Sequence, residues 1–531
     1  MATKPKNKHR KVGRLPICGF LPGAVACFCL AACTVGPNYH PPVTKVLDGF
    51  IAVSAEQKPA EDTVNNKPVV DAANWWKTLD DKELDSLIDR AIQNNPDLEI
   101  ALDRLQEART SEIVVLGQAL PVAGVGAGGG GGTGSDVARG RVAPPLAAAD
   151  NTKGTSEITD VYGFDFGWEI DLFGKIRRGM EAAAYDTQAT VAARNVVLIS
   201  VIADVARAYI DMRALQMQLA VLQKNTDVAM DYFNLTRERF ERGITNELDL
   251  TLAKRQLASL EAEKAPLIAQ VHATQYIIAV LVGVFPEDLA KELEKPEMVP
   301  QLPEKIDAGI PLDLLRRRPD IQQAERQLAG ATARIGVATA DLFPHLLLTG
   351  ATGYQAQGFG VRPELVKSIW SIGPSIEMPL LDFGTLDAVV DVADLRSREL
   401  LVNYRRTVLN AVREVDTSVD TYTGQLDRLR NLSDALAASQ RSVSLATERY
   451  DRGLTDSLNV IDAERQEYVL EQQYVSSQQS AAEQFVALYK ALGGGWEQYQ
   501  SLPPIRVPEP AVLAAFTRLL RPTNPPQDMP N

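Results

Sequence analysis

The stretch Val161-Tyr-Gly-Phe-Asp-Phe-Gly-Trp-Glu-Ile-Asp171 alternates between two kinds of side chain. Glycine and acidic residues take the odd-numbered positions from 163 onward. Large apolar side chains take the even positions, at Tyr162, Phe164, Phe166, Trp168 and Ile170. A period of two indicates a β-strand with one apolar and one polar face. Such a strand suits a soluble sandwich with its apolar face inward, or a membrane barrel with aromatic residues toward lipid and acids toward a wet lumen.

The amino terminus favours the membrane alternative. Residues 1–14 carry six basic side chains and no acid, and residues 15–32 are mostly apolar, which is the pattern of an export signal. Leu30-Ala-Ala-Cys33 resembles the lipobox of bacterial lipoproteins, in which the signal is cut before the cysteine and the cysteine is acylated. That resemblance implies lipidation of Cys33, and Thr34 after it implies sorting to the outer membrane. The alternative is an ordinary signal peptide that ends near a cysteine.

The remaining cysteines fit this interpretation, because Cys18, Cys27 and Cys29 would leave with the signal. The exported chain would then have no free thiol, disulfide or thiolate metal site. Several acyl chains on Cys33 would make a stable anchor, whereas a single chain binds a membrane only marginally.

Composition excludes several classes of function. The formal charge is −13, and removing the six basic residues of 1–14 leaves about −19, which argues against nucleic acid as a partner. The four histidines are scattered, and no Walker loop, nucleophile elbow or dinucleotide fingerprint is present. We therefore expect no enzyme, no metal and no cofactor. After residue 33 no run of 18 consecutive apolar residues occurs, so no membrane-spanning helix is expected.

An internal repeat organises the chain. Glu-Arg-Phe-Glu-Arg-Gly-Ile-Thr from Glu238 matches Glu-Arg-Tyr-Asp-Arg-Gly-Leu-Thr from Glu448 at an offset of 210 residues. Upstream, Asn95-Pro-Asp matches Arg318-Pro-Asp, and Leu120-Pro matches Phe343-Pro, both at an offset of 223. The difference falls in the Gly/Ala/Pro-rich tract 123–154, so the first copy has the longer loop. The glycine run 128–132 is interpreted as part of that flexible loop.

Each copy of the repeat is predicted to form a helix, two short strands and a long helical hairpin. The first helix runs from Asp97 to about Leu116. The second copy keeps the strand alternation from Trp370 to Met378, although Pro374 weakens that assignment. Two strands in each copy give four in the chain, which cannot close a membrane barrel alone. Copies of the chain must therefore assemble, and three copies give twelve strands.

Very long proline-free stretches follow the strands. From Gly174 to about Phe240 apolar residues recur at spacings of three and four, so the helix would be roughly 100 Å long. Gly243 is predicted just past the end of this helix. A second helix then runs back toward Gly283, and Pro266 should kink it. The second copy turns at Arg452-Gly-Leu-Thr455. These hairpins predict either a hollow helical ring continuous with the barrel or a soluble coiled coil that acts only as a spacer.

The combined motifs resemble the outer-membrane factor family, the TolC-like channels, and in particular the NodT-type lipoproteins of RND efflux systems. The matching segments are Cys33 to Tyr39, Trp75-Trp76, Asp171-Leu-Phe-Gly174, Arg317-Arg-Pro-Asp320, Leu381-Asp-Phe-Gly384 and the two Arg-Gly turns. The resemblance implies a mainly α fold with a transmembrane β-barrel: a homotrimer with a twelve-stranded barrel in the outer membrane and a periplasmic α-barrel. It also implies a passive conduit that serves a periplasmic adaptor protein and an inner-membrane RND transporter.

The resemblance also implies sites. The family has an aspartate-lined constriction just past the hairpin glycine, which corresponds here to Asp462 and Asn459 in the second copy and to Leu252 and Asp249 in the first. A ring of three like charges would attract cations at a narrow neck. The predicted gate residues are Asp249, Asp462, Asn459, Tyr450, Arg242 and Arg452. The predicted adaptor contacts are Gly243, Ile244, Thr245, Gly453, Leu454 and Thr455. The alternatives are solvated acids in a first helical turn and ordinary helical turns.

The expected segments are a signal peptide at 1–32, a lipidated amino-terminal extension and equatorial segment at 33–95, repeats at 96–300 and 301–500, and a flexible tail at 501–531. The leading functional hypothesis is an outer-membrane efflux duct for drugs or other small compounds. A duct for protein or oligosaccharide secretion and a lipid-anchored coiled-coil spacer without a pore remain alternatives. The lipid-facing aromatic strand, Tyr162, Phe164, Phe166 and Trp168, favours a duct over a spacer.

Overall fold

The computed structural model describes residues 34–42, 72–133, 156–300, 302–303, 317–359, 365–452, 454–455 and 457–499. The expected signal peptide, Cys33, Gly453 and the carboxy-terminal tail lie outside the described residues. The chain divides into two compact units. A strand unit is formed by residues 1–40, 111–185 and 329–399, and a helical unit by residues 41–110, 186–328 and 400–531.

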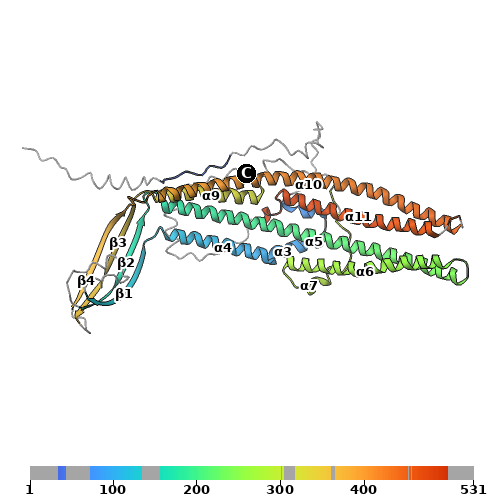
Figure 1. The fold of residues 1–531 in the computed structure, drawn as a ribbon, viewed down its shortest axis with the longest axis horizontal. Coiled ribbons are helices and arrows are strands. Elements are labelled where there is room, and N and C mark those ends of the chain that lie inside the picture. Colours follow the sequence, from blue (N-terminus) through green and yellow to red (C-terminus); the bar gives the residue numbers. More distant parts are fainter. Residues whose placement is uncertain are drawn as a thin grey trace, which may run out of the picture. The chain divides into compact units, whose positions relative to one another are not determined.

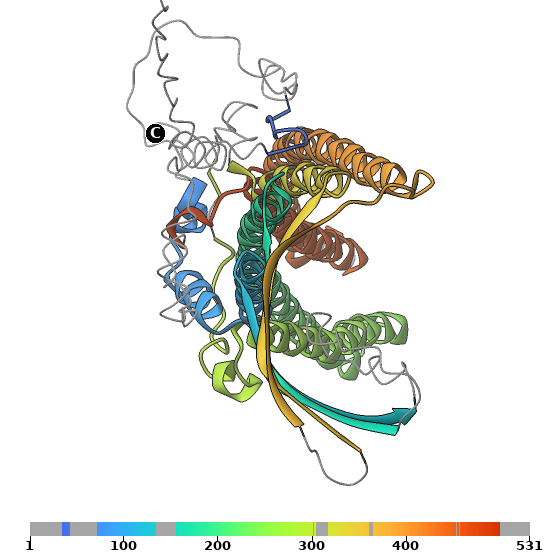
Figure 2. The same cartoon turned by 90° about the vertical axis from the view of Figure 1, so that its left-hand side faces the viewer.

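The strand unit contains one antiparallel sheet of four strands in the order β1-β2-β3-β4 (Figure 1). The strands are β1 (Val122–Thr133), β2 (Ser156–Ile170), β3 (His345–Phe359) and β4 (Leu365–Glu377). All four are curved along their length (Figure 2). The prediction of four strands, two from each copy, is confirmed.

Pairing register shows that one face of this sheet is apolar. Phe164 lies opposite Val125 and Thr352, and Thr352 lies opposite Trp370. The face is open to the surroundings, because Phe164 is 62% and Trp370 77% exposed. The other face carries small and polar side chains. On it Val161 and Ala351 are buried, with Ile369 packed against them. The alternation at 162–170 therefore predicted both the strand and its two faces.

The prediction of a loop at 128–132 was wrong. Strand β1 continues through all five glycines, which pair with residues from Val161 to Glu157 of β2. The pairing needs only backbone N–H and C=O groups, so residues without side chains can extend a ladder that a neighbouring strand supplies. Pro374 also lies in a strand: it belongs to β4 and pairs with Leu348 of β3. Within the described chain β4 is an edge strand, where the missing N–H of a proline is tolerated.

The repeat predicted from sequence is confirmed in the bounds of the elements. Helix α4 (Pro96–Gly117) and helix α9 (Pro319–Ala340) have the same length and differ by 223 in number. Helices α5 (Lys175–Glu241) and α10 (Thr385–Asp451) both have 67 residues and differ by 210. Their return helices are α6 (Glu247–Val282) and α11 (Ser457–Ala491), and α6 passes through Pro266 as one helix.

The helical unit packs its core around two tryptophans that precede these helices. Trp75 and Trp76 lie in the short helix η1 (Ala72–Leu79), and each is 1% exposed. Trp75 stacks on Tyr489 of α11 with ring centroids 5.7 Å apart and meets the edge of Phe485. Leu84 and Leu87 of helix α3 (Lys82–Asn94) belong to the same core. Shorter elements are α7 (Pro286–Ala290) and η4 (Glu497–Tyr499).

A buried arginine joins this core to polar groups. Arg213 of α5 is fully buried, forms an ion pair with Glu83 and donates to the carbonyl of Lys295 at 2.7 Å. Its guanidinium also lies 4.8 Å from the centre of the Tyr209 ring, whose hydroxyl donates to Asp81 at 2.7 Å. A charge without such partners would be costly to bury, so this network fixes α3 against α5.

Two helices, α5 and α6, each contain an 18-residue window apolar enough to cross a membrane by length and composition alone. The expectation that no helix would be apolar enough to span a membrane was therefore wrong by average hydropathy. An average over 18 residues can stay high although a few polar residues interrupt the apolar run. In α5, 61% of that window is buried inside the protein, which is typical of a core helix.

The core around Trp75 yields a stability prediction. Trp75→Ala should lower the free energy of unfolding by about 3–5 kcal/mol, because it removes a buried ring and leaves a cavity. Urea denaturation followed by circular dichroism at 222 nm measures the change. Tyr276→Ala is the control, since Tyr276 of α6 is 53% exposed, and should shift the value by less than about 0.5 kcal/mol. Equal losses in the two variants would contradict this account of the core.

Candidate functional site

The turn between α5 and α6 is built by a glycine in a left-handed conformation. Gly243 has φ of 70°, which a residue with a side chain adopts only with strain. Its N–H donates to Phe240 O at 2.9 Å, and Ile244 N–H donates to Arg239 O at 2.8 Å. These two bonds form a Schellman motif, so the predicted helix end at Gly243 is confirmed. In the second copy Leu454 N–H donates to Arg449 O at 2.9 Å, which places the same turn there.

The predicted gate residues Asp249 and Asn459 occupy equivalent places in the two return helices. Asp249 lies in the first turn of α6, where its N–H is capped by Asn246 at 2.9 Å and its carboxylate accepts from the hydroxyl of Thr245. Asn459 lies in the first turn of α11 and donates to Thr455 Oγ at 2.7 Å. Each copy therefore bonds the side chain at this position back to the threonine of the turn, with an acid in one copy and an amide in the other.

The remaining predicted gate residues make local contacts or lie exposed. Arg242 pairs with Glu238 at 3.8 Å, and Arg452 pairs with Glu448, in each case one turn back on its own helix. Asp462 is exposed on α11. Within one chain, then, these arginines pair with glutamates of α5 and α10. The suggested link from the arginines to Asp249 or Asp462 stays a prediction for contacts between chains.

Sequence reasoning missed Arg239 at the tips. Its guanidinium donates to the hydroxyl of Tyr450 and lies 5.0 Å from the centre of the Tyr450 ring. This contact joins the end of α5 to the end of α10, and so connects the two hairpins. The available signal was the difference between copies, because Tyr450 stands where the first copy has Phe240. An added hydroxyl at a matched position calls for a hydrogen-bond partner.

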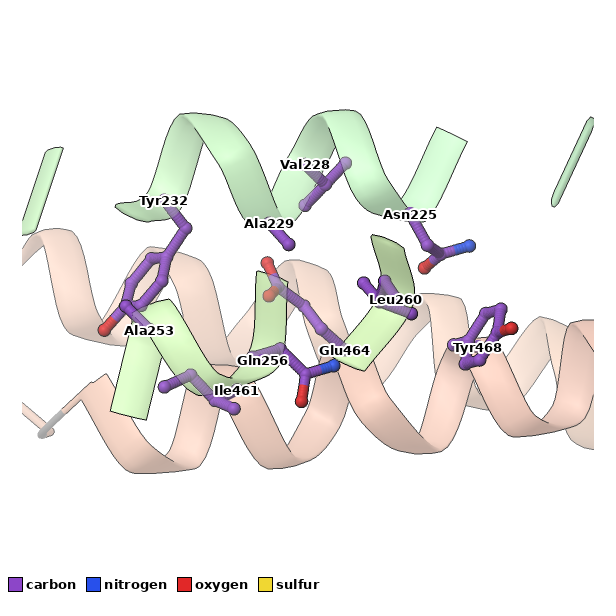
Figure 3. Close-up of a pocket in the computed structure, with 10 residues that line it drawn as sticks. All are labelled: Asn225, Val228, Ala229, Tyr232, Ala253, Gln256, Leu260, Ile461, Glu464 and Tyr468. Carbon is purple, nitrogen blue, oxygen red and sulfur yellow. The ribbon is translucent and has the colours of Figure 1, made fainter. Parts of the chain in front are cut away.

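A small cavity lies between the hairpins further from the turns (Figure 3). Its volume is about 20 Å³, enough for about one water molecule. Glu464 of α11 reaches into it toward Ala229 of α5, and the lining residues include no lysine or arginine. Burial, with the nearby charge of Glu467 adding to it, raises the pKa of the Glu464 carboxyl to about 7. The hairpins are therefore packed around an acid that is poised to titrate near neutral pH.

An ion-paired seam continues from this cavity. Lys224 of α5 bonds to Glu471 at 2.7 Å and lies 3.8 Å from Glu467, both on α11. The bond to Glu471 raises the pKa of Lys224, so the ammonium stays charged. Tyr468 donates to Glu263 of α6 at 2.6 Å. The seam contains more acids than bases, which favours protonation of the acid that lacks a cationic neighbour, Glu464.

The described segment nearest Cys33 is held by a buried arginine of the strand unit. The Arg178 side chain is 4% exposed and donates to Val35 O at 3.2 Å, Gly36 O at 3.3 Å and Asn38 Oδ1 at 2.7 Å. Val35 N–H in turn donates to Phe173 O at 3.1 Å. We call these contacts the amino-terminal clamp. Sequence reasoning did not identify Arg178, whose partners in this segment are more than 100 positions away in the chain.

Close backbone approach completes the clamp. Gly36 has φ of 84°, and a Cβ on it would lie 2.4 Å from the Cα of Gly336 in α9. A Cβ on Gly336 would in turn lie 2.8 Å from Arg178 Cγ. The clamp therefore needs glycine at both positions, and it joins α5 of the first repeat to α9 of the second. In the described part of the chain no group of three or more metal-ligating side chains comes together.

The described residues combine a sheet that has one exposed apolar face with two long helical hairpins, which is the architecture of solved outer-membrane channels. The chain of the solved outer-membrane channel OprN superimposes with a TM-score of 0.76 at 32% identity, over 88% of this chain and all of that one. The Campylobacter jejuni CmeC outer membrane channel superimposes with a TM-score of 0.73 at 22% identity, which supports the fold.

Sequence comparison identifies the family. The model of the family described as "Outer membrane efflux protein" matches residues 87–284 and again residues 310–494, so this chain belongs to that family. The chain is 30% identical to the probable efflux pump outer membrane protein TtgC of Pseudomonas putida, over 89% of this chain and 95% of that protein. It is 29% identical to nodulation protein T of Rhizobium leguminosarum bv. trifolii, over 88% and 95% respectively. The resemblance derived from sequence motifs is confirmed.

The partly buried carboxyl of Glu464 gives a pH prediction. The pKa of Glu464 is near 7 in the folded state and near its ordinary 4.5 in the unfolded state, so the folded state binds more protons between these values. Stability should therefore fall as pH rises from about 4.5 to 7. Thermal unfolding of Glu464→Gln should show a smaller slope over this range and a higher midpoint at pH 8 than wild type. Some slope remains, because burial and the neighbouring Asp211 raise the pKa of Glu483 to about 7 as well.

The control for Glu464→Gln is Glu261→Gln, which neutralises an exposed acid of α6. That variant should keep the pH slope of wild type. An unchanged slope in Glu464→Gln would show that the cavity does not protonate this carboxyl.

The clamp predicts slow hydrogen exchange near the amino terminus. In Arg178→Ala the Val35 amide should exchange about tenfold faster or more, because its bond to Phe173 then lacks the support of the guanidinium. Exchange measured by mass spectrometry on peptides from residues 34–42 tests this. Arg177→Ala is a matched control, since Arg177 binds Asp171 at 3.2 Å instead. Equal protection in both variants would show that Arg178 does not hold the segment.

Proposed function

We propose that this protein is the outer-membrane channel of a tripartite efflux system, a passive duct for drugs or other small compounds. The observation that carries the proposal is the sheet with one exposed apolar face, on which Tyr162 is 47%, Phe164 62% and Trp370 77% exposed. A soluble spacer has no use for such a face, whereas a strand in lipid requires it. We infer that Tyr162, Phe164, Phe166 and Trp168 face lipid, with Trp168 nearest the helices.

Assembly follows from the strand count. Four strands leave two open edges, and unpaired backbone groups are too costly in hydrocarbon. A homotrimer would supply twelve strands, an even number in the range of known barrels. The duct then needs no catalytic group of its own, and transport energy comes from an inner-membrane transporter of the RND class. The support for these partners is that relatives such as TtgC are described as outer membrane proteins of efflux pumps.

The adaptor protein is proposed to bind the exposed turns at the hairpin ends. Ile244 is 69% and Leu454 65% exposed, at equivalent positions of the two copies. With Gly243 and Thr245 beside Ile244, and Thr455 beside Leu454, each hairpin presents a short apolar knob. Gly453 is proposed as part of the same adaptor contact. An exposed apolar side chain flanked by polar groups is typical of a protein-binding surface.

The gate is proposed at the same end of the hairpins. In a trimer Asp249 and Asp462 would each form a ring of three acids, and the Arg239–Tyr450 contact would hold neighbouring hairpins of one chain together. The acids would select cations at the neck. Lipidation of Cys33 would add a second membrane attachment, and the amino-terminal clamp would hold the anchor close to the start of α5.

Single-channel conductance in a planar bilayer tests the duct and its gate. Wild type should give small, cation-selective steps. Asp249→Ala and Asp462→Ala should each give steps roughly two-fold larger or more and less selective, because the charge ring that narrows the neck is lost.

The control for the conductance experiment is Asp231→Ala, which removes an exposed acid of α5 before the tip and should leave the steps unchanged. A folded, oligomeric protein that conducts in no variant would favour the lipid-anchored spacer over the duct.

A further inference from the structure

The two edge strands of the sheet, β1 and β4, each present a side that the described chain leaves open. The internal repeat predicts which residues pair at these two open edges. In the first copy Val122 pairs with Gly167. In the second copy His345 pairs with Glu377, and these positions differ from the first pair by 223 and 210 residues. The offsets read from the sequence therefore hold residue by residue in the pairing of the strands.

The same offsets convert the pairing within the chain into a pairing between chains. Strand β2 of the first copy meets β3 of the second, with Phe166 opposite Gly350. Moving Phe166 forward by 210 reaches Ile376 of β4, and moving Gly350 back by 223 reaches Ala127 of β1. We propose that β4 pairs with β1 of a second copy of this chain in this register, with Ile376 opposite Ala127 of the partner subunit. This inference rests on the oligomeric channel proposed above and adds its register.

The two faces of the sheet provide an independent check. A strand shifted by one residue turns every side chain to the other face. Ala127 lies on the apolar face, because it pairs with Tyr162. Ile376 lies on the same face, because it pairs with Leu346 and Leu346 pairs with Ile170. The proposed register therefore keeps the apolar face continuous across the boundary between chains.

The register also gives the glycine run a role. The five glycines 128–132 of β1 would lie opposite residues 371–375 of β4 in the partner subunit, the segment that contains Pro374. A glycine strand leaves room for the large side chains of that segment, Ile372 above all. Gly129 would lie opposite Pro374, and a strand without side chains can adjust its backbone around the proline ring at little steric cost. The glycine run 128–132 is thus matched to the part of β4 that contains the proline.

Contacts just beyond the strands support the same pairing. Within the chain Phe173 stacks on Phe343 with ring centroids 4.7 Å apart. The equivalent of Phe173 is Phe383, which is 95% exposed, and the equivalent of Phe343 is Leu120. We infer that Phe383 packs against Leu120 of the partner subunit. Leu380 and Leu381, each 83% exposed, flank Phe383 and would be covered by the same contact.

The boundary between chains would be less polar than the boundary within a chain. Inside the chain Lys175 pairs with Asp341 at 2.7 Å, and His345 bonds to Glu169 at 2.9 Å. The equivalents of these four residues are Thr385, Gln118, Val122 and Pro379. Neither the ion pair nor the His345–Glu169 hydrogen bond is retained, because Thr385 and Gln118 are uncharged and Val122 and Pro379 are apolar. An interface with fewer charged groups suits subunits that associate once and stay together.

Cysteine cross-linking tests the register. The purified chain carries Ile376→Cys together with Ala127→Cys, and copper phenanthroline oxidises the pair. In one chain these positions lie on opposite edges of the sheet, three strand spacings or about 14 Å apart, so they cannot form a disulfide within it. The expected product on a denaturing, non-reducing gel is a ladder of dimer and covalent trimer.

Matched controls shift the second cysteine by two residues and keep it on the same face. Ile376→Cys with Val125→Cys, or with Gly129→Cys, should link several-fold less than the pair with Ala127→Cys. A stronger ladder in either control overturns the register but leaves the oligomeric channel intact. An uncross-linked trimer in all three variants overturns the pairing of β4 with β1. A protein that is monomeric by light scattering refutes the proposed trimer itself.

A double-mutant cycle tests the contact beyond the strands. Phe383→Ala and Leu120→Ala should each lower the temperature at which the oligomer dissociates. The double variant should fall no further than the worse single variant, because both changes remove one contact. Additive losses would overturn the pairing of Phe383 with Leu120. The control Phe173→Ala removes the equivalent ring within the chain and should add its effect to that of Leu120→Ala.

Discussion

An open sheet edge cannot be left in hydrocarbon, because no water is present to bond its N–H and C=O groups. This constraint governs the rest of the structure. The four strands in the described residues have two edges, and the proposed assembly with further copies of the chain would close both. Each strand must also carry apolar side chains on one face and leave the other to a wet interior. The alternation from Tyr162 to Ile170 and its counterpart around Trp370 meet the second requirement, and repetition of the unit meets the first.

The internal repeat gives the two hairpins the same dimensions, and the differences between the copies fall on the residues of the proposed gate. Helices α5 and α10 have the same number of residues, so the outgoing helices of the two hairpins are equally long. At the tips the copies diverge: Asp249 corresponds to Asn459, and Phe240 corresponds to Tyr450. The Arg239–Tyr450 bond requires the hydroxyl that Tyr450 carries and Phe240 lacks. In the proposed trimer the tips would therefore have three-fold rather than six-fold symmetry, although the strands and helices repeat almost perfectly.

Much of this architecture could be predicted from the sequence, because it depends on local periodicity and on the repeat. Strand β2, helix α4 and the turn at Gly243 all follow from side-chain spacing or from a glycine at a helix end. The glycine strand β1 could not, since residues 128–132 have no side chains to alternate, and their pairing depends on β2 some 30 positions away. The Arg178 clamp and the Glu464 cavity also depend on contacts between distant segments. No periodicity indicates that Arg178 contacts Asn38, or that an acid of α11 points toward Ala229.

The distribution of core residues explains why the tips, rather than the strand end of the hairpins, are suited to move. Around Trp75 the helices share a large apolar core with an ion pair buried in it. Toward the turns the buried apolar cluster shrinks to Leu222, Ala229, Leu257 and Leu260. Beside it lies a cavity that holds the acid Glu464 and no basic residue. Fewer buried apolar contacts mean a lower free energy of local opening. Separation of the hairpins at their ends would therefore leave the core around Trp75 packed, and the proposed gate at the tips would cost the least stability.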